Sequence, residues 1–188
     1  MKGIVMKFGG SSVSDAGRIA NVRAIVASKK EKKPVVIVSA RRGVTDDLLS
    51  LARKALAGER GGLSALSRRH RDAAEELSVG DEVIAPLLEE LGDLLKGISL
   101  IKELTPRTLD YVVSFGERMS TRIIASCFTK MGLAAEQHGA PDLGLLTNDE
   151  FGGAQPLPEG DVLLKANIGK LTKLPVVTGY IGKTRNGD

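Results

Sequence analysis

The chain has 188 residues, of which 42% are hydrophobic and 27% charged, and these values are typical of a soluble globular protein. No apolar run approaches the ~18 residues that a membrane span requires, and Met1-Lys2-Gly3 leads directly into an apolar segment, so we expect a cytoplasmic protein with no signal peptide and no membrane partner. The net charge is +4, but basic residues are dispersed and only 3% of residues are aromatic, which argues against a nucleic-acid partner.

Strands and helices alternate over the first third of the chain. Continuous apolar runs predict buried strands at 3–8 and 34–39, and helical spacing of apolar residues predicts helices at 16–30 and 46–57. Two strands that are separated by a helix are normally parallel neighbours. This order therefore predicts an α/β fold with a largely parallel sheet sandwiched by helices.

The middle of the chain is predicted to be helical. Leucines at helical spacing over 63–104 are interrupted near Gly80 and Pro86, which indicates a helical hairpin inserted into the α/β pattern. A basic cluster at 68–71 lies on the first helix of this hairpin, and we expect it to form a solvated face. His70 has no partner at metal-ligand spacing, so it is interpreted as structural, and no metal site is predicted.

A further helix is predicted over 117–131, and its first residue is a carboxylate on the apolar side. At 100° per residue, Glu117 shares one face with Ile124 and with Cys127, the only cysteine, which is expected to pack in the core. Arg118 points away from this face and is expected to meet solvent. A carboxylate in a first helical turn is favoured by the dipole, but one directed at the core needs a partner or a function.

The last part of the chain returns to the α/β pattern. Short extended segments are predicted at 134–137 and 144–147, a crossover helix at 161–172 and a strand at 175–180. No internal repeat and no Gly/Ser/Pro-rich linker interrupts the sequence. The chain is therefore expected to be one compact domain or part of one.

The heptapeptide 7–13, Lys-Phe-Gly-Gly-Ser-Ser-Val, follows the first predicted strand directly. Two glycines after a strand allow backbone N–H groups to approach an anion, and Lys7 adds a positive charge, so the segment is a candidate phosphate loop. A Gly-Gly pair after a strand is also typical of an ordinary turn. Neither G-x-x-x-x-G-K-[ST] nor G-x-G-x-x-G occurs here, so any nucleotide is bound by neither of those loops.

Four ordered motifs resemble those of aspartate kinases, which belong to the amino acid kinase family. The first is the heptapeptide, which is similar to K-F-G-G-[ST]-S-V. The second, at 36–45, is similar to a strand followed by S-A-x-x-G-[VI]-T, and the third, at 104–120, to L-T-P…D…S-x-G-E-R-[LM]-S. The fourth, at 175–182, resembles V-P-V-V-T-G-[FY]-I-G.

The resemblance implies an amino acid kinase-like fold and a particular domain organisation. Residues 1–188 would be the amino-terminal, substrate-binding part of an amino acid kinase domain. The half of that domain that holds adenine and ribose, and the regulatory domains that sense end-product amino acids, would be absent from this chain.

The resemblance also implies a reaction and a role for each matching residue. An aspartate kinase transfers a phosphoryl group from ATP, with Mg²⁺ on the ATP phosphates, to the β-carboxylate of L-aspartate, giving 4-phospho-L-aspartate for the synthesis of lysine, threonine and methionine. Lys7 would neutralise the transferring phosphoryl group, Ser39 and Thr45 would contact aspartate from the loop after the second strand, and Glu117 would receive the α-ammonium group. The phosphate oxygens would be held by the N–H groups of Gly9, Gly10 and Ser11.

Two other functions remain open. One is a different amino acid kinase, such as a glutamate or acetylglutamate kinase, against which the heptapeptide and the segment 114–120 argue. The other is a non-catalytic module that binds aspartate or assembles with another chain. We also expect a homo-oligomer, because a sheet edge and a helix face left exposed by a missing half-domain tend to associate.

Overall fold

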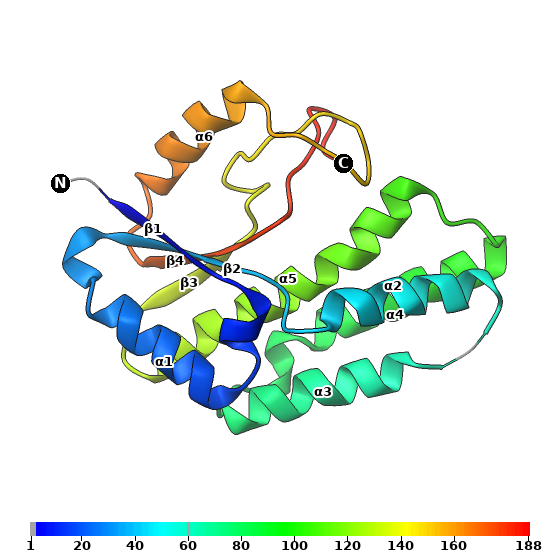
Figure 1. The fold of residues 1–188 in the computed structure, drawn as a ribbon, viewed down its shortest axis with the longest axis horizontal. Helices are drawn as coiled ribbons and strands as arrows, with labels where there is room; N and C mark the ends of the chain where they lie inside the picture. The colour runs from blue at the N-terminus through cyan, green and yellow to red at the C-terminus, as the bar shows by residue number, and fades with distance from the viewer. Residues whose placement is uncertain (1–2, 60) are drawn as a thin grey trace.

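The computed structural model describes residues 3–59 and 61–188, so Met1 and Lys2, on which the expectation about the start of the chain depends, lie outside the described residues. One parallel sheet organises the fold, with the strand order β1-β2-β4-β3 (Figure 1). Its strands are β1 (Ile4–Phe8), β2 (Pro34–Val38), β3 (Ala135–His138) and β4 (Leu174–Thr178). The predicted α/β class and the parallel sheet are confirmed.

Helices cover both faces of this sheet, with α6 (Pro158–Ile168) on one side and α1 (Ala16–Ala27) on the other (Figure 1). Side chains of a strand alternate between faces, so Val36 and Val38 of β2 enter the large core with α1, whereas Val35 and Ile37 join the smaller core that α6 covers. Burial on both faces explains why β2 is a continuous apolar run.

The helical insert lies beside the sheet and packs around a long helix, α5 (Pro106–Lys130) (Figure 1). It consists of α3 (Leu63–Glu76) and α4 (Ala85–Ile101), and α2 (Val44–Leu56) precedes it and packs beside it. The hairpin predicted for 63–104 is confirmed as α3 and α4, and a 3₁₀ turn (η3, Asp81–Val83) follows Gly80, with Pro86 in the first turn of α4.

The long helix corrects the prediction of a helix over 117–131. α5 begins eleven residues earlier, where Thr105 caps it by accepting a hydrogen bond of 3.1 Å from the N–H of Thr108 and Pro106 occupies the first turn. Glu117 therefore lies in the middle of α5, and the helix dipole does not account for it. Gly116 does not end the helix, because its cost of about 1 kcal/mol is small beside the packing of a buried helix.

Two basic segments also differ from the predictions. Arg118 does not point into solvent, because its guanidinium binds both carboxylate oxygens of Glu90 on α4, at 3.1 and 2.7 Å, and lies 4.4 Å from the centre of the Phe115 ring. The 68–71 cluster is only partly a solvated face: His70 is fully buried and Arg69 pairs with Asp47 at 2.8 Å. His70 has the structural position expected of it, since its Nδ1–H donates to the carbonyl of Leu66.

Element boundaries shift by a few residues elsewhere. α1 ends at Ala27, short of the predicted residue 30, and a separate 3₁₀ turn (η2, Lys30–Lys32) follows it. α2 begins at Val44, two residues before its predicted start, and α6 spans Pro158–Ile168 where 161–172 was expected, because a proline fits the first helical turn. In the segment 144–147, only isolated bridges at Leu146 and Thr147 form.

No helix in the described part of the chain combines the length and the apolar character that crossing a membrane demands.

Candidate functional site

The carboxyl ends of three neighbouring strands meet at one edge of the sheet, which is where ligands bind in open parallel sheets. Backbone hydrogen bonds hold the segments that follow these strands together. The N–H of Ser39 donates to Phe8 O at 3.2 Å, and the N–H of Arg42 donates to Gly10 O at 3.3 Å. On the other side of β2, Gly179 N–H donates to Val38 O at 2.8 Å. The candidate phosphate loop and the loop after β2 are therefore direct neighbours.

The second half of the candidate phosphate loop forms a short 3₁₀ helix (η1, Gly10–Val13), and Gly9 separates this helix from β1. Neither glycine uses a positive φ, since Gly9 is extended and Gly10 lies within η1, so neither is required for its backbone conformation. The two glycines have different structural roles. A Cβ on Gly10 would lie 2.5 Å from Ala40 O, so glycine is needed there for close approach to the loop after β2. A Cβ on Gly9 would meet nothing within 4 Å, which leaves space for a ligand.

Lys7 and Ser11 flank these glycines and are both exposed. Lys7 lies on β1 opposite Ile37, and it projects from the face of the strand opposite to Met6 and Phe8, which pack in the large core. An exposed ammonium group beside the loop is available to an anion. Among the described residues, no hydrogen bond joins Lys7 to the other candidate residues.

Glu117 is buried where α5 meets the loop after β2, and only 4% of it is exposed. Its Oε1 accepts a hydrogen bond of 3.1 Å from the backbone N–H of Ala40. Within the described residues its Oε2 is buried and has no hydrogen-bond partner. Burial raises the pKa of Glu117, and the hydrogen bond from Ala40 opposes this shift only in part. A buried carboxylate with one unpaired oxygen is unfavourable unless another group pairs with it.

Gly116 brings Glu117 this close to the loop. A Cβ at Gly116 would lie 2.7 Å from the Cβ of Ala40 and 3.3 Å from Cγ1 of Val44, so any side chain there would push α5 away from the loop. The glycine that precedes Glu117 is thus required for the hydrogen bond between Glu117 and Ala40.

Ser39 and Thr45 are both half-buried near this contact. Ser39 lies on the loop after β2, as expected. Thr45 does not lie on that loop, because α2 begins at Val44 and Thr45 belongs to its first turn. The structure therefore brings Ser39 and Glu117 to either side of Ala40, and the phosphate loop adjoins them through Gly10.

Sequence reasoning missed two arginines beside these residues. Arg41 is buried and its guanidinium donates to the carbonyls of Arg69, at 3.1 Å, and of Ser14. Arg69 in turn donates to the carbonyl of Arg42. The sequence offered one signal for Arg41: a buried arginine is unusual unless its charge is paired, and Arg41 lies only three residues after β2, on a loop between two buried elements.

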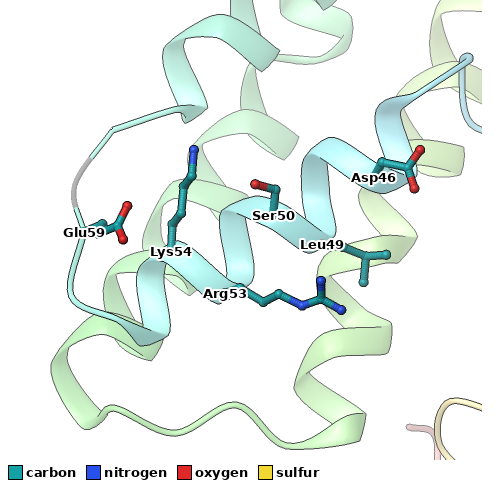
Figure 2. Close-up of a pocket in the computed structure, with 6 residues that line it drawn as sticks. All are labelled: Asp46, Leu49, Ser50, Arg53, Lys54 and Glu59. Atoms are coloured by element: carbon teal, nitrogen blue, oxygen red, sulfur yellow. The ribbon is translucent and has the colours of Figure 1, made fainter.

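One pocket of the described residues lies away from this edge. A pocket of about 340 Å³ lies along the outer surface of α2, and Figure 2 shows its lining. The lining residues are Asp46, Leu49, Ser50, Arg53, Lys54 and Glu59. None of them is a candidate site residue. Within residues 3–59 and 61–188, no group of three His, Cys, Asp or Glu side chains is arranged to hold a metal ion.

The fold and this edge define a class: a parallel α/β protein with a glycine loop and a lysine at the end of one strand and a buried carboxylate of a neighbouring helix beside the next loop. The comparison with family models identifies the family. The amino acid kinase family model matches residues 2–188, and the chain belongs to that family.

Known relatives agree with this assignment. The chain is 42% identical to the chloroplastic aspartokinase 3 of Arabidopsis thaliana over 95% of its own length, and 32% identical to aspartokinase 3 of Bacillus subtilis over 98%. Its structure is similar to that of Escherichia coli aspartokinase III in complex with aspartate and ADP, with a TM-score of 0.85 and 28% sequence identity over 99% of the chain. The chain spans 34% of the Arabidopsis protein, 41% of the Bacillus protein and 42% of the Escherichia coli chain.

Proposed function

We propose that this chain is the substrate-binding part of an aspartate kinase, which transfers a phosphoryl group from ATP to the β-carboxylate of L-aspartate. The observation that carries the proposal is the buried carboxylate of Glu117, whose Oε2 has no partner among the described residues. Relatives named aspartokinase and the aspartate and ADP bound to the Escherichia coli enzyme support it.

Glu117 would bind the α-ammonium group of aspartate. An ammonium group supplies the charge and the donor that Oε2 lacks, and a charge-assisted hydrogen bond of this kind is worth about 1.5–3 kcal/mol. Because Oε2 is shielded from solvent, the side chains around it must shift when the ligand enters. The hydroxyl groups of Ser39 and Thr45 would contact the same ligand.

Lys7 and the loop after β1 would bind the phosphoryl group. The lysine side chain is exposed, and the space beside Gly9 admits an oxygen atom close to the backbone. N–H groups of Gly9, Gly10 and Ser11 would hold phosphate oxygens, as backbone groups do in other anion sites. This loop and Ser39 lie next to each other, which suits a reaction that joins two anionic substrates.

The reaction needs no general base, because the β-carboxylate of aspartate is already ionised near pH 7. One carboxylate oxygen forms a bond to the γ-phosphorus, the bond from that phosphorus to the bridging oxygen breaks, and ADP leaves with the electron pair. The protein aligns the two anions and neutralises charge on the moving phosphoryl group. No step is assigned to a metal held by the described residues; Mg²⁺ would be bound through the ATP phosphates.

Two measurements test this proposal. Calorimetry should detect binding of L-aspartate, weaker binding of L-glutamate and none of succinate, which lacks the α-ammonium group. ATP-dependent hydroxamate formation with aspartate would then report the acyl phosphate, with glutamate as the control. Turnover with glutamate instead of aspartate would indicate another amino acid kinase. Aspartate binding without turnover would indicate the substrate-binding half alone, and no binding to folded protein would contradict the proposal.

The homo-oligomer and the cytoplasmic location remain predictions. Sedimentation of the purified chain tests the first, and fractionation of the source cells tests the second.

A further inference from the structure

Arg41 is a buried guanidinium that joins three segments far apart in the sequence. Only 7% of the residue is exposed. It extends from the loop after β2, one guanidinium nitrogen donates to the carbonyl of Ser14 between η1 and α1, and the other donates at 3.1 Å to the carbonyl of Arg69 on α3. The phosphate loop, the loop after β2 and the helical insert therefore meet at this side chain.

Burial of this charge is unfavourable by itself. Desolvation lowers the pKa of Arg41, and the nearby guanidinium of Arg69 lowers it further. Two carbonyl acceptors in different segments offset part of the loss of water, while Nε is buried without a partner among the described residues. The planar fork of arginine can reach both carbonyls at once, whereas a lysine ammonium group is a single point charge. An arginine that only covers the protein surface does not need hydrogen bonds to the carbonyls of two different segments.

The loop that Arg41 anchors carries the contacts of the candidate aspartate site. Arg41 directly follows Ala40, whose N–H binds Glu117, and Ser39 precedes Ala40. Beyond Arg41 the same loop is held at Arg42, whose N–H donates to Gly10 and whose carbonyl accepts from Arg69. The side chain of Arg42 is exposed.

We propose that Arg41 is a positioning residue: by binding Ser14 and Arg69 it fixes the loop that presents Ser39 and the Ala40 N–H beside Glu117, and thereby preorganises the aspartate site. The proposal rests on the proposed function, because it takes aspartate as the ligand. In metal sites, replacing a residue that orients a ligand from behind typically costs roughly ten- to a hundredfold in affinity, and we expect an effect of this order for Arg41.

The test compares Arg41→Ala, Arg41→Lys and the matched control Arg42→Ala, which removes an adjacent exposed arginine. Calorimetry measures L-aspartate affinity, and hydrogen exchange followed by NMR measures protection of the Ala40 amide. We expect both Arg41 variants to bind aspartate roughly tenfold more weakly and to exchange the Ala40 amide roughly tenfold faster, because lysine cannot reach both carbonyls. Arg42→Ala should match the wild type in both measurements.

Each other outcome has a defined meaning. Unchanged Ala40 exchange in Arg41→Ala overturns the proposal, and faster exchange with unchanged aspartate affinity reduces Arg41 to a structural anchor and also overturns it. Wild-type aspartate affinity and wild-type Ala40 exchange in Arg41→Lys would show that a guanidinium bound to both carbonyls is not required, and would reject that part of the proposal. If the wild-type chain binds no aspartate, the proposed function fails, and the exchange measurement still decides whether Arg41 fixes the loop.

Discussion

The backbone N–H of Ala40 donates a hydrogen bond of 3.1 Å to the carboxylate of Glu117, a residue 77 positions later in the chain. This bond connects the loop after β2 to the middle of α5, and it leaves the other carboxylate oxygen buried without a partner in the described part of the chain. The predictions for Glu117 and Gly116 depend on this contact, and those for His70 and Lys7 concern other parts of the molecule.

Replacing Glu117 with glutamine should separate stability from binding. Burial raises the pKa of Glu117 above its unfolded value, so the stability associated with its protonation is present at low pH and is lost as the pH rises through the folded pKa. At pH 7, Glu117→Gln should therefore raise the free energy of unfolding by on the order of 1 kcal/mol, because a neutral amide is easier to bury than a charge. Aspartate affinity should fall roughly ten- to a hundredfold.

Urea unfolding and calorimetry test this prediction, with the exposed Glu89→Gln as a control that should change neither quantity. Glu117→Ala should abolish aspartate binding, and it should lower the free energy of unfolding by about 1–3 kcal/mol, because it leaves the buried N–H of Ala40 without its acceptor. A large loss of stability in these variants with unchanged aspartate affinity would show that the carboxylate is structural.

Gly116→Ala should weaken both the fold and the site. The added Cβ would lie 2.7 Å from Ala40 Cβ, and overpacking of this kind costs about 1–3 kcal/mol, which exceeds the gain of about 1 kcal/mol in helix propensity. Gly97→Ala is the matched control, because it also lies within a helix but its Cβ would meet nothing within 4 Å. Thermal unfolding should show Gly97→Ala stabilised and Gly116→Ala destabilised. Stabilisation of both variants would contradict the close approach of α5 to the loop.

His70 should make the protein less stable in mild acid. Burial lowers the pKa of His70 to about 4, so the unfolded chain binds a proton at a pH where the folded chain does not. The stability contributed by neutral His70 is present above about pH 6.5 and is lost as the pH falls towards 4, with a decrease of about 2 kcal/mol by pH 5.

Urea unfolding of the wild type and of His70→Asn at pH 8 and pH 5 isolates this effect, because asparagine retains a donor for the carbonyl of Leu66. The difference between the two pH values should be smaller in the variant by about 2 kcal/mol. If the free energy of unfolding changes equally with pH in the wild type and in His70→Asn, His70 is already protonated in the folded state at pH 5.

Lys7→Ala should weaken binding of phosphate groups and leave binding of aspartate nearly unchanged. Loss of the exposed ammonium group should weaken binding of inorganic tripolyphosphate roughly tenfold, while aspartate affinity stays nearly unchanged. In a full-length version that also carries the nucleotide-binding half, the same substitution should remove hydroxamate formation. Lys29→Ala, which removes an exposed lysine after α1, is the control. Equal tripolyphosphate affinity in all three proteins would remove Lys7 from the phosphate site.

The sequence alone determined the class of the fold, because period and composition report burial directly. The continuous apolar run of β2 predicts a strand covered on both faces. Gly80 lies in the connection between the two hairpin helices, and Pro86 lies in the first turn of the second helix, α4. The motifs around Lys7 and Glu117 also indicated which residues are candidates for the site. These features are local, so they can be read from neighbouring residues.

Only the tertiary structure decided how these residues are held. The start of α5 at Pro106 placed Glu117 in mid-helix, since a capping threonine and burial on several sides outweigh a glycine. The roles of Gly10 and Gly116 depend on approach to Ala40, and that of Arg41 on the carbonyls of Ser14 and Arg69. These contacts join segments distant in sequence, so their distances and burial arise only when the chain is packed.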